Sequence, residues 1–544
     1  MSDATPGGTL FLSRAEQGRR RGAALAALAL VLVFLFAPFL VLGVSSQSTG
    51  TALSSLTDSY LLGVIGFTLF QALLSTLLSL LFGVPLALAL HRSRLPGRVL
   101  VLRLFLLPQA LPTLVGALGL VTVFGRNGAL ADAFVFLGLP RPSIYGLTGI
   151  LVAHVFFNMP LVARVALGGL QSVPAESWKL AGQLALSPLA VFRLLEAPAL
   201  RAILPGAAAL VFMLCFTSFT LVLVLGGGPA ATTLQVAIYQ SLRYDFAPDR
   251  ALALTLAQIT LVSLFLLPTL LARSPAASSA FSLGATQRRF DPRSPWRAGF
   301  DALVLAIGLL FLLSPFAAIL QSGLRADLGK LVSDPMVQRA ALTSLGIAVA
   351  ATALGLALSL ALVLSSGLSG LPRLVIRLVP ALGLVVPPIL VGAGWFLALR
   401  LTGDVARLAP AVAVLANAMA ILPFATRILA PEAEAAARRG GRLAASLGLS
   451  GWARLRHVEL AALGRPLALS ASLGLALALG DLGAVALFGN QDFVTLPTLL
   501  LQRMGSYRST DAEGLALLLG ALCLLLILAA ELLAARGLRE RAPE

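Results

Sequence analysis

One stretch of the sequence occurs twice. Residues 180–205 read LAGQLALSPLAVFRLLEAPALRAILP, and residues 443–468 read LAASLGLSGWARLRHVELAALGRPLA. At a shift of 263 positions the copies share leucine, alanine and serine positions, and both contain an arginine and a glutamate three residues apart: Arg193 and Glu196, or Arg456 and Glu459. This order indicates an internal duplication.

Both copies are polar segments in an otherwise apolar chain. Each is predicted to form two short amphipathic helices, broken at the centre by Pro188 or Gly451. After the break, Phe192 and Leu195 lie at i and i+3, and the second copy repeats this spacing. Such an apolar face rests either on the protein's own membrane domain or on a partner. Duplication favours a docking surface for a two-fold symmetric partner.

The composition is that of an integral membrane protein. Hydrophobic residues make up 58% of the 544 residues, charged residues only 12%, and the mean hydropathy is +0.94. The fold class is therefore predicted to be all-α, with about twelve membrane-spanning helices in two parallel six-helix repeats. Their predicted centres are near Val33, Ser75, Val115, His154, Phe216, Gln258, Leu310, Ala351, Val391, Leu415, Ala478 and Leu522.

The net charge of +17 is distributed unevenly among the loops. Arginine and lysine gather at the two ends, at both repeated loops and in the stretch between the halves, whereas the alternate loops are poorer in them. This pattern predicts that the repeated loops and both termini lie in the cytoplasm. The positive charge therefore indicates membrane topology and anionic lipid, and does not indicate a nucleic-acid partner.

The chain divides into two matching halves. We predict a first half over residues 1–272, a cytoplasmic linker over 273–297 and a second half over 298–544, with the repeated loops near 171–205 and 431–468. PTLVGALG at 112–119 matches PILVGAGW at 388–395 at a shift of 276, so the halves differ by an insertion or deletion before the repeated loops. The apolar run at 23–44 is too long for a signal peptide and predicts an uncleaved first span.

The sequence contains no pattern for catalysis. It lacks a phosphate-binding loop, its three histidines are scattered, and its two cysteines lie in predicted spans. We therefore expect no enzyme, no metal site and no cofactor bound by this chain.

Asp481 is the one acidic residue in the apolar run LALALGDLGAVALFG at 475–489. An intramembrane carboxylate is a candidate for the translocation path. The alternative is a structural hydrogen bond or ion pair between helices, and the matched residue in the first half is Ser218. For His154, Asn158 and Asn417 we expect hydrogen bonds to neighbouring helices.

The repeated loop resembles the coupling loop of ABC importer permeases, which is written as an acid and two alanines with a glycine six residues after the acid. Gly448 occupies the glycine position in the second half, and Ala185 replaces it in the first. The acid position falls on Lys179 and Arg442, although Glu176 and Glu434 are nearby.

Longer stretches resemble one subfamily, the fused permeases of bacterial thiamine and thiamine pyrophosphate importers. These stretches are residues 212–246, 452–468 and 480–509, and the length and two-half layout agree across nearly the whole chain. The resemblance implies an inner-membrane permease, two copies of a cytoplasmic ATPase that use ATP, and a periplasmic thiamine-binding protein. A ferric iron permease of the same fold is an alternative, and a secondary transporter is a more distant one.

We predict three groups of site residues. Those for ATPase coupling are Ala185, Ser187, Pro188, Phe192, Arg193, Glu196, Gly448, Ser450, Gly451, Trp452, Leu455, Arg456 and Glu459. Those for the translocation path are Asp481 and Ser218. Those for contact with the binding protein are Gly226, Gly227, Gly228, Tyr239, Gly489, Asn490 and Tyr507.

Overall fold

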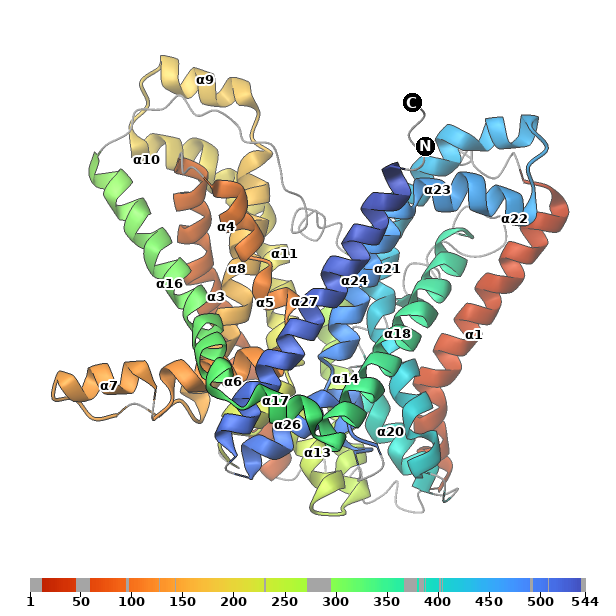
Figure 1. The fold of residues 1–544 in the computed structure, drawn as a ribbon. Coiled ribbons are helices and arrows are strands. Elements are labelled where there is room, and N and C mark those ends of the chain that lie inside the picture. Colours follow the sequence, from red (N-terminus) through yellow and green to blue (C-terminus); the bar gives the residue numbers. More distant parts are fainter. Residues whose placement is uncertain are drawn as a thin grey trace. The chain divides into compact units, whose positions relative to one another are not determined.

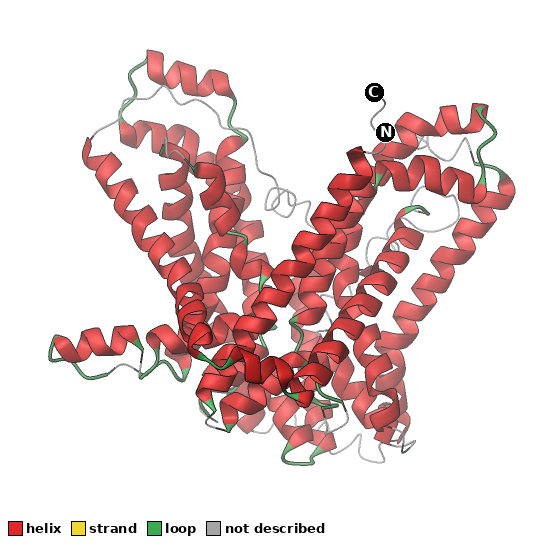
Figure 2. Ribbon diagram, in the orientation of Figure 1, coloured by secondary structure: helices red, strands yellow, loops and turns green. Residues whose placement is uncertain are grey.

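The described part of the chain is built from helices, and no strand occurs within it (Figure 2). The structure is a computed structural model. It describes residues 12–45, 59–93, 97–126, 128–141, 143–228, 231–271, 295–365, 379–380, 386, 388–400, 403, 405–489, 493–506 and 508–539. Of the predicted linker, residues 273–294 lie outside these ranges, and the predicted division into halves stays a prediction.

The helices follow in chain order (Figure 1). Up to the linker they are α1 (Arg14–Ser45), α3 (Ser59–Arg92), α4 (Arg98–Leu104), α5 (Leu107–Ala110), α6 (Thr113–Phe124), α7 (Ala129–Phe136), α8 (Leu147–Gln171), α9 (Ala175–Gln183), α10 (Pro188–Val191), the π-helical turn η3 (Phe192–Glu196), α11 (Ala197–Phe216), α12 (Thr220–Leu225), α13 (Leu234–Arg243) and α14 (Pro248–Leu271). After it they are α16 (Pro295–Arg325), α17 (Leu328–Ser333), α18 (Pro335–Val363), α20 (Pro388–Arg400), α21 (Val405–Ser446), α22 (Gly451–Arg454), the π-helical turn η5 (Leu455–Glu459), α23 (Leu460–Ala462), α24 (Gly464–Leu479), α25 (Gly483–Ala486), α26 (Leu496–Gly505) and α27 (Ser509–Arg539).

The chain forms two compact units that exchange their first helices. One unit contains residues 1–53, 238–255 and 327–544, and the other contains 54–237 and 256–326. In the first, α1 packs on α18 and α20, where the Trp395 Nε1 donates to the Phe34 carbonyl at 3.0 Å. In the second, α16 packs on α3 and α6, and Pro315 lies against Gly119. Each unit is thus completed by the first helix of the other half of the sequence.

The helices confirm the predicted all-α membrane class. Nine described helices are long and apolar enough to cross a membrane, and a bent pair, Arg98–Ala110 with Thr113–Phe124, makes a tenth. The pair bends by 105°. The bend lies at Leu111, whose backbone is extended. Leu111 precedes Pro112, and a residue before a proline is disfavoured in the helical region. The count of twelve stays a prediction.

One predicted span is displaced, and another is interrupted. Hydropathy places a fifth span around Phe216 and an eleventh around Ala478, but α11 ends at Phe216 and α24 ends at Leu479. Apolar residues resume a few positions after both ends, at Phe219 and Leu482, so hydropathy does not detect the breaks. The first of these spans begins instead at Pro188, inside the repeated loop, and runs to Phe216 as one helical stretch of 29 residues. The second, Gly464–Ala486, contains its predicted centre.

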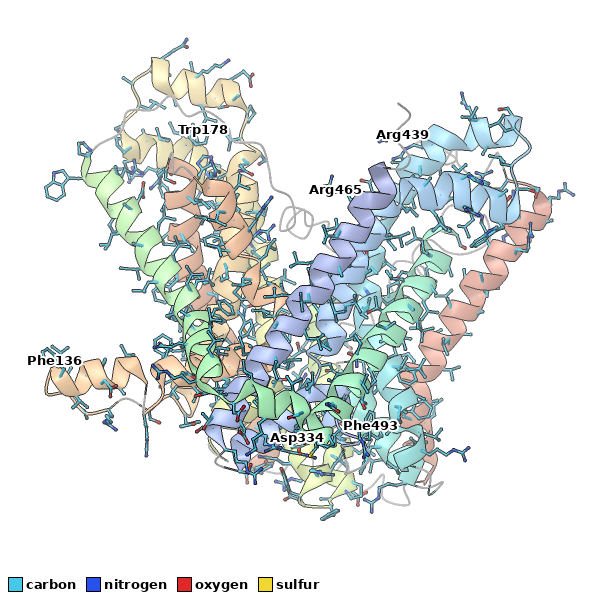
Figure 3. All side chains as sticks on the ribbon, in the orientation of Figure 1. Phe136, Trp178, Asp334, Arg439, Arg465 and Phe493 are labelled. Atoms are coloured by element: carbon cyan, nitrogen blue, oxygen red, sulfur yellow. The ribbon has the colours of Figure 1, made fainter. Side chains whose placement is uncertain are left out.

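The expected length difference between the halves falls at α7. Between α6 and α8 the first half has the residues 125–146, which include α7, whereas only residues 401–404 separate α20 from α21. Phe136, at the end of α7, is 90% exposed, and α7 projects away from the other helices of its unit (Figures 1 and 3). The insertion therefore lies outside the bundle and leaves the packing of the spans alike in the two halves.

Close packing of α3 on α8 depends on Gly83. A Cβ atom there would lie 2.7 Å from the Val162 Cβ and 2.8 Å from the Met159 carbonyl oxygen, whereas a Cβ at Gly66 of the same helix would meet nothing within 4 Å. Small residues allow such close helix approach in membranes.

We therefore expect Gly83→Ala to destabilise the protein by about 1–3 kcal/mol through overpacking. Gly66→Ala is the matched control and should leave stability unchanged. Thermal unfolding of the detergent-purified protein measures both. Equal melting temperatures for the two variants would contradict the observed packing of α3 on α8.

Candidate functional site: the repeated loops and the Asp481 pocket

The repeated loops share the turn that ends their first helix. In the first, α9 ends in a turn in which the Leu186 N–H donates to the Ala181 carbonyl at 3.1 Å and Ala185 has φ +45°. In the second, the Leu449 N–H donates to the Ala444 carbonyl at 2.9 Å and Gly448 has φ +65°. Both are Schellman turns, in which a left-handed residue ends the helix. The alanine that departs from the family pattern therefore keeps the conformation of the glycine.

The predicted break in each loop is confirmed, but the helices beside it are not all short. In the second loop the helix before the break is the end of the 42-residue α21, and in the first loop the helix after the break runs on through η3 into α11. Pro188 and Gly451 are the first residues of the second helix in each loop, and the break consists of the four residues before them. Pro188 fits this position because its missing N–H would have no helical acceptor in the first turn. The Ser187 Oγ accepts a hydrogen bond from the Ala190 N–H at 3.3 Å and so caps that turn.

The first loop is anchored by Trp178 of α9. Its ring is fully buried, packs with Ala181 and Val191, and lies 5.3 Å from the ring of His91 at the end of α3 (Figure 3). One face of α9 therefore rests on the protein's own helices. The opposite face is exposed to solvent.

The exposed faces of the two loops match at three pairs of apolar positions. Leu184 is 61% exposed and its counterpart Leu447 is 64% exposed. The other matched exposed pairs are Leu180 with Leu443 and Leu189 with Trp452. We call these six residues the paired apolar faces. Exposed large apolar side chains at equivalent positions of two loops indicate a site for a partner present in two equivalent copies.

Sequence reasoning placed the apolar face at different residues. Phe192 and Leu455 are only half-buried, and Leu195 packs against the core around Trp178. The exposed apolar face could have been predicted from leucines at i and i+4 before the break, because such a pair shares one face of a helix. These pairs are Leu180 with Leu184 and Leu443 with Leu447.

The structure exposes most of the predicted coupling residues and buries two of them. The exposed residues are Ala185, Ser187, Pro188, Arg193, Gly448, Ser450, Trp452 and Arg456, and Gly451 is half-buried. Glu196 and Glu459 lie in the interior of their units. These two carboxylates do not form part of a surface for a partner, and any role in coupling must act through the chain's own helices.

The two left-handed positions allow a matched pair of substitutions. Because a side chain in the left-handed region costs about 1–2 kcal/mol, we expect Gly448→Ala to lower stability by that amount and Ala185→Gly to raise it slightly. Space is not the cause at Gly448, since an added Cβ meets nothing within 4 Å. Thermal unfolding of the two variants checks the signs, and a stabilising Gly448→Ala would contradict the observed backbone.

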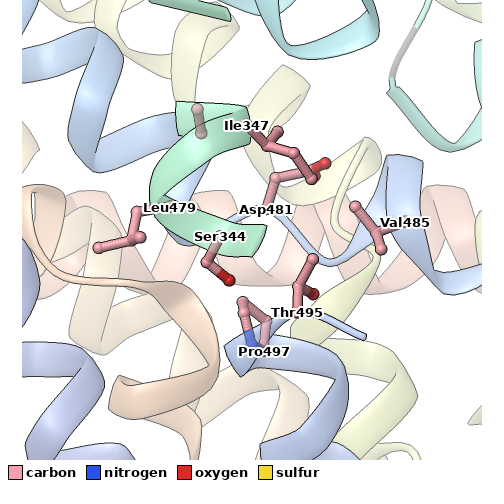
Figure 4. Close-up of a pocket in the computed structure, with 8 residues that line it drawn as sticks. Ser344, Ile347, Leu479, Asp481, Val485, Thr495 and Pro497 are labelled. Atoms are coloured by element: carbon pink, nitrogen blue, oxygen red, sulfur yellow. The ribbon is translucent and has the colours of Figure 1, made fainter. Parts of the chain in front are cut away.

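Asp481 lies between α24 and α25 and accepts three hydrogen bonds. The Gly483 N–H donates to Oδ1 at 3.0 Å, and the Ala484 N–H and the Asn417 Nδ2 donate to Oδ2 at 3.2 and 3.1 Å. The carboxylate therefore caps the start of α25 and ties it to α21. Asp481 also borders a pocket (Figure 4). The residues that line it are Ser344, Ile347, Ala478, Leu479, Asp481, Val485, Thr495 and Pro497.

Matched polar positions make different contacts in the two halves. His154 corresponds to Asn417 at the 263-residue shift, and its Nδ1 lies 2.8 Å from the Ser75 Oγ. Asn158 Nδ2 donates to the Cys215 Sγ at 3.4 Å. The expectation that these side chains bond to neighbouring helices is confirmed. Ser218, which matches Asp481, is half-buried beyond the end of α11 and donates its N–H to the Cys215 carbonyl at 3.4 Å.

The predicted contact residues for a binding protein are only partly exposed. Gly227 and Gly228 are exposed, Gly226 is buried and Gly489 is half-buried. Tyr239 is also buried, and its ring packs edge-on against that of Tyr244 at 5.8 Å, so the surface aromatic is Tyr244. Burial and the neighbouring phenol both raise the pKa of Tyr239. Asn490 and Tyr507 lie outside the described residues.

Comparison with known proteins defines the class. Residues 79–276 match the family of binding-protein-dependent transport system inner membrane components. The chain is 47% identical over 514 residues to the thiamine transport system permease protein ThiP of Brucella abortus, with 94% of each chain covered. It is 41% identical to proteins of the same name from Salmonella typhimurium, covering 94% of this chain and 96% of that one, and from Escherichia coli, covering 89% and 91%.

The chain therefore belongs to the family of ABC importer permeases that contains these thiamine transport system permease proteins. It is an inner membrane component of a binding-protein-dependent transport system.

Proposed function

We propose that this chain is the permease of an ATP-driven importer that moves thiamine and thiamine pyrophosphate from the periplasm to the cytoplasm by alternating access. The observation that carries the substrate is identity of 41–47% over most of the chain to permeases named for thiamine transport. A periplasmic thiamine-binding protein delivers the solute. The chain itself binds no cofactor, and ATP is used by a separate subunit.

The paired apolar faces support two docking sites for the ATPase. Each loop presents a large exposed side chain at the centre of its face, Leu184 or Leu447, next to exposed basic residues such as Lys179 or Arg442. Two equivalent sites on one chain suit two copies of one ATPase subunit. When the ATPase dimer closes on ATP, the loops move and the units reorient as rigid bodies, and hydrolysis reverses the motion.

The placement of charge supports a cytoplasmic position for both termini. Arg20, near the start of α1, bonds to Glu459 of the second loop, so α1 begins at the loop side of its unit. Arg19 also lies beside Gly451 of that loop. The basic residues at both ends of the chain favour the cytoplasmic face of the inner membrane.

Uptake in cells lacking this gene tests the substrate. Labelled thiamine at nanomolar concentration and labelled ferric iron are supplied in parallel, with the wild-type chain restored as control. We expect loss of thiamine uptake alone. Loss of iron uptake alone would overturn the substrate and leave a permease of the same fold for iron.

A further inference from the structure

Each repeated loop contains a buried glutamate at an equivalent position. Glu196 is 0% exposed and Glu459 is 5% exposed, and each is the last residue of a π-helical turn, η3 or η5. Isolated π-helical turns are rare and occur often at functional sites. A buried carboxylate needs a charged or hydrogen-bonding partner, because burial of an uncompensated charge is strongly unfavourable.

In the first loop the partner is Arg92, the last residue of α3. Its guanidinium holds both carboxylate oxygens of Glu196, with the Nε atom 3.1 Å from Oε1 and the Nη2 atom on Oε2. The third guanidinium nitrogen, Nη1, lies 3.7 Å from the Oδ1 atom of Asp301 in α16. The Asp301 side chain is buried as well. The loop is thus connected through Arg92 to the first helix of the other half.

In the second loop the partners are Arg454 and Arg20. The Glu459 Oε1 accepts from the Arg454 Nε at 3.1 Å and from the Arg20 Nη2 at 2.7 Å. Arg20 also donates to Glu16 at 2.7 Å, one turn earlier in α1. The Ser365 Oγ, at the end of α18, donates to the Arg20 carbonyl at 2.9 Å. This loop is therefore connected to α1, again the first helix of the other half.

The two clusters reach the same arrangement with different residues. Arg454 has the buried apolar residue Val191 at its equivalent position. Asp301 and Arg20 both lie near the start of their helices but carry opposite charges. Only the glutamate is shared. In both units, buried charged side chains connect a repeated loop to the first helix of the opposite half.

We propose that Glu196 and Glu459 are positioning residues, which with Arg92, Asp301, Arg20 and Glu16 clamp each repeated loop to the first helix of the opposite half. Separating loop from helix would leave a buried charge without its partner, so the two move together. A displacement of the loop then passes along the whole of α16 or α1 to the other side of the membrane. The inference rests on the proposed function in taking the loops as the ATPase docking sites.

Two substitutions weaken the clamps and leave Glu196 and Glu459 paired. Arg20→Gln removes the hydrogen bond between Glu459 and α1 while Arg454 still holds Glu459, and only the 4.0 Å contact of Arg454 with Glu16 then connects this loop charge to α1. Asp301→Asn removes the charge in α16 while Arg92 still holds Glu196. The experiment uses the complex of permease, ATPase and binding protein in lipid nanodiscs and proteoliposomes. It measures co-purified ATPase, solute transported per ATP hydrolysed, and stimulation of hydrolysis by the loaded binding protein.

We expect the ATPase to co-purify normally, because the paired apolar faces are untouched, and transport per ATP to fall about tenfold, within the range typical of coupling between sites. Arg20→Lys keeps the charge and should recover part of the coupling. Arg438→Gln is the matched control, since its pair with Glu434 on the second loop is exposed on both sides and contributes little.

Unchanged transport per ATP in both Arg20→Gln and Asp301→Asn would overturn the clamp, even if their melting temperatures fell, because that result describes a purely structural role. If one variant does not accumulate, the other decides. Failure of the proposed function is a separate result: the wild-type chain would then not co-purify with an ATPase at all.

Discussion

Replacing Leu184 and Leu447 together by aspartate should release the ATPase subunits from an intact permease. Both side chains are more than half exposed, so each substitution removes little packing within the chain. Burying a leucine in an interface is worth about 1.5–3 kcal/mol, so its loss lowers affinity at each loop by roughly 10- to 100-fold. A buried aspartate adds a further penalty. Co-purification of the ATPase with tagged permease measures the effect.

The matched control is the double substitution Leu184→Met and Leu447→Met, which keeps an apolar side chain at each position and should retain the ATPase. The single aspartate variants should each lose part of it. Full co-purification with the double aspartate variant, together with normal transport, would show that the paired apolar faces are not the docking sites.

Loss of the Asp481 charge should reduce thiamine transport more than it reduces stability. The carboxylate lies in an apolar segment, where a negative charge attracts a cationic group such as the thiazolium ring. The space beside it in Figure 4 is too narrow for a water molecule, so the ring would meet Asp481 only in another conformation of the transport cycle. It also caps α25, so the substitution must keep a cap. Asp481→Ser does this, because serine is a good capping residue and is the residue at the matched position Ser218.

We expect Asp481→Ser to lower thiamine uptake about tenfold, the effect of losing on the order of 1.4 kcal/mol of attraction. Asp481→Glu, which keeps the charge, should retain more activity. If Asp481→Ser shows normal uptake and normal protein level, then Asp481 serves only as a helix cap and its contact with Asn417 as a structural hydrogen bond.

The sequence was sufficient for the membrane class and for the duplication. Hydropathy found the cores of the long spans because lipid requires a run of apolar residues. It could not locate the ends of α11 and α24, since only a few polar residues separate each end from the next apolar segment, which begins at Phe219 or Leu482. The sequence also could not predict that α1 and α16 each pack in the unit of the other half, because their apolar surfaces suit any neighbouring helix.

The duplication located the repeated loops in the sequence, but which of their residues are exposed was predicted only in part. Glu196 and Glu459 occupy equivalent positions of the two copies, which made them candidate site residues. Only the structure shows that both are buried and paired with arginines. Their partners Arg92 and Arg20 lie far away in the sequence. No local pattern relates an arginine at the end of α3, or near the start of α1, to these loops.

The most direct test of the account is transport by proteoliposomes that contain this chain, its ATPase and the periplasmic binding protein. We predict that labelled thiamine accumulates only when ATP is present on the side of the repeated loops, and that omission of the ATPase abolishes accumulation. Accumulation without the ATPase, driven by an ion gradient, would contradict it and show that this chain is a secondary transporter.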